Sequence, residues 1–502
     1  MPHVSYKSPQ YAHYFVVAVL AFGAVMTQAA PQRLSEVEAR HLLIRSGFAP
    51  TQAQVEALVG QGAVQAVHAI IGQAVDLNSP LAQKPATSPA PDFTTTPAPV
   101  YRGSEASREQ QQAFRQEQNR LTQEIKNWWM QQMLHSPTPL AERMTLLWHG
   151  HFATSQQKVV RAHSMWRQHQ LLRQHALGSF KDMLHAVAKD PAMLVYLDGA
   201  NSRKDAPNEN FAREVMELFV LGESTAPGLG GYTEADIKEA ARAFTGWSIE
   251  RDDFSYVYRP RMHDAGSKTL LGSSGNFDGN AALDVMLARP EAARFVATKL
   301  WREFISPTPE PVALERIAKA LRASDWSISA ALREVFLSDA FWELKNRGSL
   351  IKSPVELLVG TVRQFGLPIS HAANQTLGQA MEPSIGQQVL HPQMLVQRSA
   401  TLGQNLLQPP NVKGWPGYTQ WINSTTLLER KRFLEQLLPT RFDASSWLAS
   451  YGARADSEPG FAEKERIVTA ILSYNSTQNI ASGTVGLSLI RALVQDSAYQ
   501  LK

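Results

Sequence analysis

Most of this 502-residue chain consists of helix-length segments in which apolar residues recur every three or four positions. That spacing places apolar side chains on one face of an α-helix, whereas a half-buried strand requires alternation of apolar and polar residues. The clearest β signal is a short stretch at 254–258, and loops rich in Pro and Gly separate the helical segments. The pattern predicts a mainly α fold: a multi-helix, bundle-like body with long loops and little or no β-structure.

Changes in composition divide the chain into four predicted parts. Residues 1–30 carry an early Lys, an apolar run of 13 residues and then small residues, which is the pattern of a secretory signal peptide. Residues 31–77 predict an N-terminal helical segment, and six prolines mark 78–104 as a linker or long surface loop. Residues 105–502 are expected to form the main helical body.

The N-terminal pattern predicts export. Its apolar run is too short for a membrane span, and cleavage is expected after Ala29 or Ala30. No twin-Arg pair precedes the run, so we expect a Sec-type signal and a periplasmic or secreted protein. The alternative is a buried N-terminal helix. The absence of Cys suits an oxidising compartment and excludes disulfide scaffolds, zinc fingers, iron–sulfur sites and Cys nucleophiles.

Charge and motif content exclude several classes of function. The net charge is only +4 and no long Lys/Arg block occurs, so nucleic acid is not an expected partner. No run of 18 apolar residues follows the N-terminus, which argues against an integral membrane protein. Nucleotide-binding glycine motifs and the G-x-S-x-G and H-E-x-x-H motifs are missing, so nucleotide cofactors and Ser-triad hydrolysis have no support.

Histidine density marks the first candidate site. Seven of the 14 His residues fall within 135–185, and the pair His149 and His151 follows an amphipathic helix expected over 139–148. Closely spaced neutral imidazoles bind divalent metals. Alternatively, His149 caps the carbonyl groups at the end of that helix, or the pair belongs to a packed aromatic cluster. Both interpretations stay open at this point.

The second candidate is a helix expected over 208–221, in which carboxylates and amides sit among large apolar residues. Asn210, Glu214 and Glu217 share one stripe of this helix. The two glutamates could ligate a metal together with the histidines, as in carboxylate sites inside helix bundles. Alternatively, they belong to a buried ion-pair network with Arg213 and Arg242, which the interleaved arginines favour.

The third candidate is the next expected helix, 234–246. Glu239 and Arg242 lie three residues apart on it, and its small residues allow close approach of a neighbour. We therefore expect it to pack against 208–221, with buried contacts between glutamates and arginines. His263 follows in a His-Asp pair that by itself indicates a turn.

The fourth candidate is an irregular loop at 408–421, rich in Pro and Gly and carrying Trp415, Tyr418 and Trp421. If exposed, these rings would form a stacking platform for a sugar or a polymer. If buried, they would hold a long loop against the body, which is the more frequent situation for Trp.

These segments, in this order, resemble the bacterial family catalogued as domain of unknown function 1800. Gly150 stands where a polar residue is usual and Val220 where Thr is common, and neither departure removes a candidate ligand. The resemblance implies an exported, mainly helical protein whose gene often neighbours one for an exported sulfatase-like protein; it supplies no catalytic residue or substrate. The stretches that carry it are 41–48, 139–152, 190–194, 207–222, 232–247, 352–356 and 409–415.

Two functions of different classes remain open. One is a periplasmic enzyme that depends on a divalent metal, which would activate water or bind an oxyanion. The other is a non-catalytic exported partner or scaffold protein that acts with a sulfatase-like protein or a polysaccharide through Trp415, Tyr418 and Trp421. For the enzyme, the tentative metal ligands are His149, His151, Glu214, Glu217 and His263. The candidate catalytic residues are Glu214, Glu217, Arg213, Asn208 and Asn210. Glu239 and Arg242 would contact these residues and hold them in position without touching the metal themselves.

Overall fold

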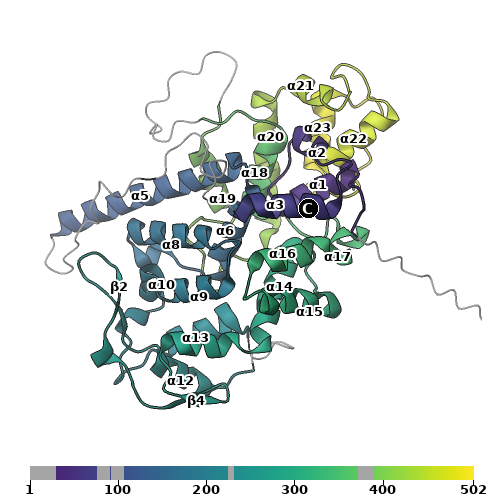
Figure 1. The fold of residues 1–502 in the computed structure, drawn as a ribbon. Helices are drawn as coiled ribbons and strands as arrows, with labels where there is room; N and C mark the ends of the chain where they lie inside the picture. Colours follow the sequence, from purple (N-terminus) through teal and green to yellow (C-terminus); the bar gives the residue numbers. More distant parts are fainter. Residues whose placement is uncertain (1–29, 76–90, 92–106, 224–230, 371–388) are drawn as a thin grey trace, which may run out of the picture.

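A computed structural model describes residues 30–75, 91, 107–223, 231–370 and 389–502 (Figure 1). The predicted signal peptide, apart from Ala30, and the predicted linker at 78–104, apart from Pro91, lie outside the described residues. In the described parts the chain is predominantly helical and contains two small antiparallel sheets of two strands each. The predicted mainly α fold is confirmed.

The helices are distributed along the whole described chain. In the first half they are α1 (Glu36–Ser46), α2 (Gln52–Glu56), α3 (Ala63–Val75), α5 (Arg108–His135), α6 (Pro139–His151), α7 (Gln156–Val159), α8 (Ala162–Gln174), α9 (Phe180–Ala188), α10 (Pro191–Tyr196), α11 (Glu209–Glu214) and α12 (Glu234–Ala243). In the second half they are α13 (Gly279–Leu287), α14 (Pro290–Phe304), α15 (Pro311–Ala323), α16 (Ile328–Leu337), α17 (Asp339–Trp342), α18 (Pro354–Gln364), α19 (Pro392–Thr401), α20 (Ser424–Arg441), α21 (Ala444–Ala449), α22 (Phe461–Ile471) and α23 (Gly486–Gln495).

Short elements fill the connections between these helices. The π-helix η3 (Val215–Val220) continues α11. The strands are β1 (Trp247–Ile249), β2 (Tyr256–Tyr258), β3 (Lys268–Leu270) and β4 (Ser273–Gly275), and β1 pairs with β2 and β3 with β4. The strand predicted at 254–258 is therefore confirmed over its last three residues. The 3-10 turns are η2 (Gly199–Asn201), η4 (Pro260–Met262), η5 (Leu344–Asn346), η6 (Tyr418–Trp421) and η7 (Ser497–Gln500).

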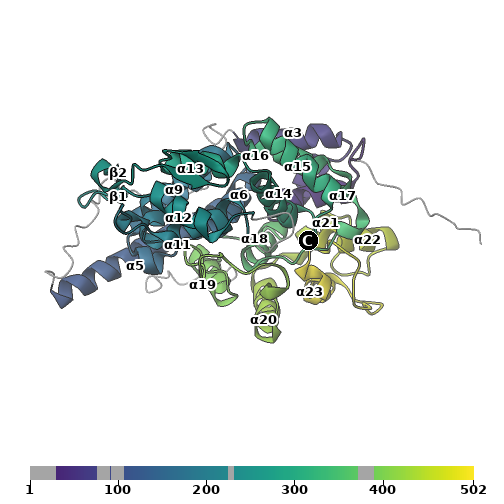
Figure 2. The same ribbon diagram turned by 90° about the horizontal axis from the view of Figure 1, so that it is seen from below.

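Buried apolar side chains form two clusters, and α6 contributes to both. The first cluster gathers side chains from α1, α3, α9 and α11–α17, and it includes Trp148 of α6. The second gathers side chains from α5 and α18–α23, and it includes Leu146 of α6. Figure 2 shows α19, α20 and α23 on one side of the molecule and α3, α15 and α16 on the opposite side. The end of α6 therefore lies where the two clusters meet.

Local sequence signals explain where α6 and α18 begin. Pro139 occupies the first turn of α6, where its missing N–H removes no helical hydrogen bond. Ser353 caps α18, and the Glu356 carboxylate accepts a 2.8 Å hydrogen bond from the Ser353 backbone N–H. Glu356 is thus fixed at the helix start before any tertiary contact is counted.

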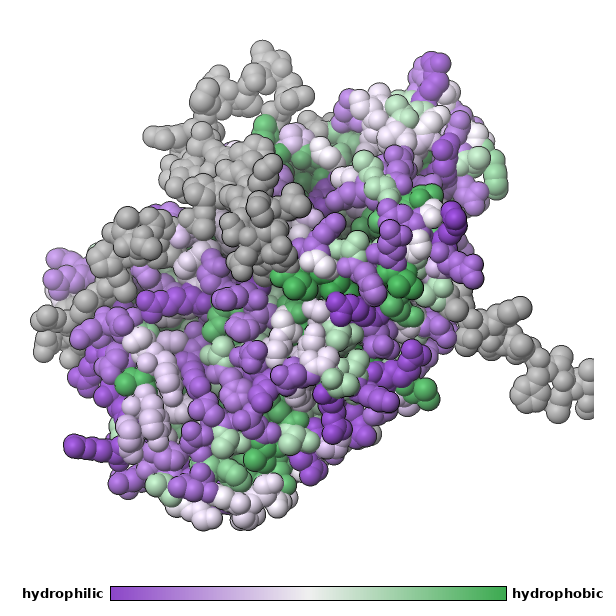
Figure 3. All heavy atoms as spheres, in the orientation of Figure 1, coloured by the Kyte–Doolittle hydropathy of each residue, from purple (hydrophilic) through white to green (hydrophobic). Residues whose placement is uncertain are grey.

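On the face shown in Figure 3, hydrophilic residues predominate among the coloured atoms, and hydrophobic residues lie in small groups between them. The first turns of α5 extend away from the body (Figure 1). None of the helices described is both long and apolar enough to cross a membrane.

Candidate functional site

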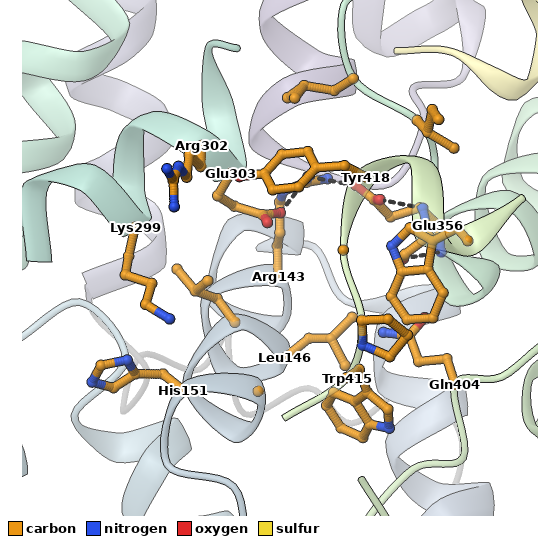
Figure 4. Close-up of a pocket in the computed structure, with 18 of the residues that line it drawn as sticks. Arg143, Leu146, His151, Lys299, Arg302, Glu303, Glu356, Gln404, Trp415 and Tyr418 are labelled. Atoms are coloured by element: carbon orange, nitrogen blue, oxygen red, sulfur yellow. Dashed lines mark hydrogen bonds and ion pairs between the residues drawn. The ribbon is translucent and has the colours of Figure 1, made fainter. Parts of the chain in front are cut away.

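A cavity of ≈ 270 Å³ lies at the end of α6, between α14, the start of α18 and the loop 409–421 (Figure 4). We call it the α6 cavity. Five Lys or Arg side chains line it, but only two carboxylates do. The lining residues that matter for its chemistry are Arg143, Lys299, Arg302, Lys413 and Lys502; Glu303 and Glu356; His151; and Trp415, Tyr418 and Trp421.

His151, the last residue of α6, is one of the residues that line the α6 cavity. Its side chain is 4% exposed, and Nε2 lies 3.1 Å from the backbone oxygen of Phe219. Because a carbonyl oxygen only accepts, Nε2 carries the proton and Nδ1 keeps its lone pair. Nδ1 has no hydrogen-bond partner among the described residues. Burial, reinforced by the positive charge of Lys299, lowers the pKa of His151 well below its ordinary value, so the ring is neutral at neutral pH.

The carbonyl group that orients His151 belongs to the π-helix η3. In this segment the Leu221 N–H donates to the Met216 oxygen, five residues earlier, at 2.7 Å. Short π-helical turns are rare and occur frequently at functional sites. Here the wider turn accompanies a carbonyl group, that of Phe219, which bonds to an imidazole on a different helix. Residues 215–220 therefore set the tautomer of His151.

The loop 409–421 packs directly against the last turn of α6, which contains His149 and His151. Gly414 has φ +90°, and a Cβ there would overlap the carbonyl oxygen of Gly150. Trp415 donates its Nε1–H to the Asn405 oxygen at 3.1 Å, which fixes the ring beside Gly150. Val412 packs against the first core cluster and Trp415 against the second. The loop thus closes the α6 cavity across the junction of the two clusters.

Lys299 and Arg302 form the cationic wall of the α6 cavity. Both extend from α14, and Figure 4 shows Lys299 pointing into the cavity toward His151. Among the described residues, neither head group forms a hydrogen bond or an ion pair; Lys299 Nζ lies 5.2 Å from the centre of the Phe295 ring. Burial, followed by the nearby charge of Arg302, lowers the pKa of Lys299 to about 8. This wall has positive charge available for an incoming anion.

A buried ion-pair network forms the opposite wall. Arg143 Nη2 lies 2.6 Å from Glu303 and also pairs with Glu356, which in turn pairs with Lys502. Arg143, Glu356 and Lys502 are 2%, 5% and 5% exposed. Burial alone would raise the pKa of Glu356, but Arg143 and Lys502 together hold it below its ordinary value. These charges satisfy one another, so this wall stabilises the fold and gives the cavity its shape.

The other predicted metal ligands lie in separate environments. His149 Nε2 is 3.1 Å from His169 Nδ1 and its ring lies 4.6 Å from that of Trp129, inside an aromatic cluster. His263 Nδ1 lies 2.9 Å from the Thr245 oxygen, near α12. Within the part of the chain that the structure describes, no three His, Asp or Glu side chains gather into a group able to hold a metal ion. The structure therefore does not bring His149, His151, Glu214, Glu217 and His263 together as a ligand set.

The predicted network between α11 and α12 is confirmed only in part. The two helices pack against each other, and Glu239 pairs with Arg242 at 2.9 Å, as expected. Arg242 also pairs with Asp264 at 2.7 Å. Arg213, however, pairs with Glu234 at 2.6 Å on the surface, with side chains 34% and 68% exposed.

The expectation of a buried network there is wrong. After Glu214 the chain is π-helical, so the stripe of positions expected from α-helical spacing does not continue to Glu217. Neither glutamate forms an ion pair with Arg213 or Arg242 among the described residues. Asn208 caps α11 by accepting a 2.9 Å hydrogen bond from the Phe211 N–H, and Asn210 is exposed.

The three rings of the predicted aromatic loop lie in two different environments. Trp421 is 6% exposed and anchors the loop, whereas Trp415 and Tyr418 are half-buried and line the α6 cavity. Sequence reasoning missed Lys299 and Arg302. They lie three apart on an amphipathic helix, a pattern that usually means a solvated face, and only the distant loop 409–421 makes them part of a cavity.

Comparison with known proteins gives one match. The family model described as "Protein of unknown function (DUF1800)" matches residues 41–501, nearly the whole chain. The matched range includes all of the second core cluster, the first cluster except Leu34 and Ala39, and every lining residue of the α6 cavity except Lys502. No curated protein and no solved structure matches the chain.

Proposed function

The chain belongs to the family of proteins of unknown function DUF1800, and we propose that it is an exported protein that binds an acidic saccharide in the α6 cavity. One observation carries the proposal: Lys299 and Arg302, without partners among the described residues, share a cavity with the half-buried ring of Trp415. Cations without counter-ions favour a ligand that carries negative charge. An aromatic ring at the edge of a cavity favours a ligand with an apolar face.

An acidic sugar offers each group that the α6 cavity can bind. Its carboxylate or sulfate group would receive charge-assisted hydrogen bonds from Lys299 and Arg302. The C–H face of the ring would pack on Trp415. The cavity volume of ≈ 270 Å³ lies near the small end of ligand sites, about 300–1,000 Å³, so it suits a single sugar unit of a longer chain.

The geometry supports binding more than the metal-dependent enzyme that was the other hypothesis. The five predicted metal ligands do not converge, and the Glu356 carboxylate in the cavity wall is already paired with Arg143 and Lys502. Elemental analysis of the purified protein tests the metal hypothesis directly. A stoichiometric transition metal that is lost in a His151→Ala variant would restore it.

Export and partnership belong to the same proposal. Export is supported by the apolar run and small residues within 1–30, and a mature protein starting at Ala30 or Pro31 would show it by intact mass. A sulfatase-like partner is supported only by the family resemblance, and a sulfated saccharide would be a natural shared ligand. Co-purification from the periplasm of the native organism tests this partnership.

Calorimetric titration with short oligosaccharides tests the proposed ligand class. The panel would contain uronate oligomers, sulfated oligomers and neutral oligomers of equal length. We expect binding to at least one acidic series and a loss of affinity of at least about tenfold for the neutral series, since a hydrogen bond to a charged group contributes about 1.5–3 kcal/mol. Equal affinity for the neutral and acidic series would contradict the proposal, as would binding to neither.

A further inference from the structure

A second cavity, of ≈ 200 Å³, lies between α1, α2, α3 and the start of α6, and it shares no lining residue with the α6 cavity. We call it the α3 cavity. Apolar residues predominate in its lining, among them Leu43, Leu58, Ile70 and Leu140. Among the described residues that line it, Arg363 of α18 is the one charged side chain. The α3 cavity thus combines an apolar interior with a single cation.

Arg363 carries a positive charge for which the described residues supply no counter-ion. Its Nε donates to the Ala49 oxygen at 3.2 Å and its Nη1 to the Leu134 oxygen at 2.6 Å, but it forms no ion pair with any of them. Burial alone lowers the pKa of Arg363 to about 10, so the guanidinium group stays charged at neutral pH. The buried Arg143 differs, because two glutamates pair with it. Since buried charges in proteins are normally paired, Arg363 favours an anionic ligand.

The third nitrogen of this guanidinium group is available to a ligand. Nη2 of Arg363 forms no hydrogen bond with the described residues, and it is not one of their fully buried polar atoms that lack a partner. It therefore keeps accessible surface, on a side chain that lines the α3 cavity. Because carbonyl groups already hold Nε and Nη1, the guanidinium group has little freedom to turn, and Nη2 is positioned to donate to a carboxylate.

The start of α6 adds to the positive potential in the α3 cavity. Pro137, Thr138 and Pro139 line the cavity, and the Thr138 side chain makes no capping hydrogen bond to α6. The N-terminal end of a helix carries partial positive charge, which stabilises an anion nearby. The helix end and Arg363 belong to different elements and act in the same direction.

From this arrangement we propose that the α3 cavity binds a short straight-chain aliphatic carboxylate, with the carboxylate on Arg363 Nη2 and the alkyl chain along Leu58 and Ile70. Phe48 is the one aromatic residue among the described residues of the lining, so the walls suit an alkyl chain better than a ring. The volume sets the length: at about 30 Å³ for a group the size of water, the cavity holds roughly seven such groups, as in an acid of about six carbons. This site is separate from the proposed saccharide site.

Calorimetric titration of the purified protein with the unbranched carboxylates from acetate to decanoate tests the proposal. Each added methylene should tighten binding roughly fourfold until the chain fills the cavity, because it removes that much more apolar surface from water. The neutral match is 1-hexanol. We expect hexanoate to bind at least about tenfold more tightly than 1-hexanol, since a hydrogen bond to a charged group is the stronger kind.

Two kinds of variant locate the ligand. Ala69→Phe adds bulk at an exposed position of the lining, and His68→Phe adds the same ring one residue earlier on α3, outside the lining. We expect the first to weaken hexanoate binding at least about tenfold, the equivalent of about two buried methylene groups, and the second to leave it unchanged. Arg363→Gln should remove the preference for hexanoate and keep the affinity for 1-hexanol.

The outcomes decide the proposal without reference to saccharide binding. Failure of every carboxylate to bind, equal affinity for hexanoate and 1-hexanol, or unchanged hexanoate binding in Ala69→Phe overturns it. The double variant Lys299→Ala with Arg302→Ala should bind hexanoate like the wild type; a loss there would place the carboxylate in the α6 cavity and also overturn the proposal. Circular dichroism checks each fold, and if Arg363→Gln unfolds, the Ala69→Phe and His68→Phe pair decides.

Discussion

The two groups of Arg–Glu pairs in this protein have similar chemistry and different surroundings. Arg143 and Glu356 have side chains that are 2% and 7% exposed and lie at the junction of the two core clusters. Arg213 and Glu234 have side chains that are 34% and 68% exposed and lie on the surface of α11 and α12. Water screens the second pair but not the first. Burial, and not the type of pair, therefore decides which of the two the fold depends on.

Glu356→Ala is the strongest test of this comparison. It leaves Arg143 and Lys502 buried without their main counter-ion, and breaking such a buried pair costs about 3–5 kcal/mol. Denaturant unfolding of the variant measures the loss. A change in unfolding free energy below about 1 kcal/mol would show that water reaches this network and that the comparison is wrong.

Burial of neutral histidines should also make the stability of the fold depend on pH. His149 and His169 are fully buried, and burial lowers the pKa of His149 to about 3 and that of His169 well below its ordinary value. The unfolded chain therefore binds more protons than the folded chain below about pH 6.5, the ordinary value for His. Stability should fall as the pH drops from 6.5 toward 3, by up to about 1.4 kcal/mol per pH unit for each histidine.

Unfolding curves across this pH range check the expectation. A His149→Gln variant can keep the hydrogen bond to His169 Nδ1 without titrating, so its stability should depend less steeply on pH than that of the wild type. Identical slopes in the two proteins would contradict the assigned role of burial.

Gly414 and Gly150 lie against each other where the loop 409–421 meets α6, and substitutions at the two positions should have different effects on stability. Gly414→Ala introduces a Cβ against the Gly150 carbonyl group at φ +90°, and we expect a loss of about 1–3 kcal/mol together with displacement of Trp415. Gly150→Ala places its Cβ 3.6 Å from the Trp415 ring, an ordinary contact within a helix. That variant should be neutral or slightly stabilising. Thermal melting of both, with Trp fluorescence, distinguishes them; a larger loss for Gly150→Ala would contradict the packing described.

The smallest effects are expected at the exposed pair. Glu234→Ala removes the partner of Arg213 in water and should leave the melting temperature unchanged. Glu217→Ala should behave in the same way, because Glu217 has no ion pair with Arg213 or Arg242 among the described residues. This replaces the expectation, drawn from helical spacing, that Glu217 supports a buried arginine. A drop of several degrees in either variant would show that this face is covered in solution.

Local periodicity predicted the helices well because a helix is specified by neighbours in sequence. The helices expected over 139–148 and 234–246 agree with α6 and α12 to within a few residues. The prediction from α-helical spacing was wrong at η3, because a π-helix departs from the 3.6-residue repeat and no residue type in this segment marks the departure. The predicted stripe of Asn210, Glu214 and Glu217 on one helix face is therefore not formed.

The candidate site was predicted only in pieces. His151, Trp415 and Tyr418 were each singled out, but in two unrelated motifs more than 250 residues apart in sequence. Their meeting at one cavity depends on tertiary packing, which spacing along a helix does not contain. Lys299 and Arg302 were missed for the same reason, and so was Glu356, whose capping role is visible in the Ser353 motif while its ion pairs are not.

The central claim is that the unpaired cations of α14 make the α6 cavity an anion site, and a matched pair of double variants tests it most directly. Lys299→Ala with Arg302→Ala removes both cations from the cavity; Lys319→Ala with Arg333→Ala removes the same charge from exposed positions outside it. Affinity for the best acidic oligosaccharide should fall at least about 100-fold in the first protein, since each hydrogen bond to a charged group contributes about 1.5–3 kcal/mol, and stay near the wild-type value in the second. Equal losses in the two proteins, or wild-type affinity in the first, would contradict the claim.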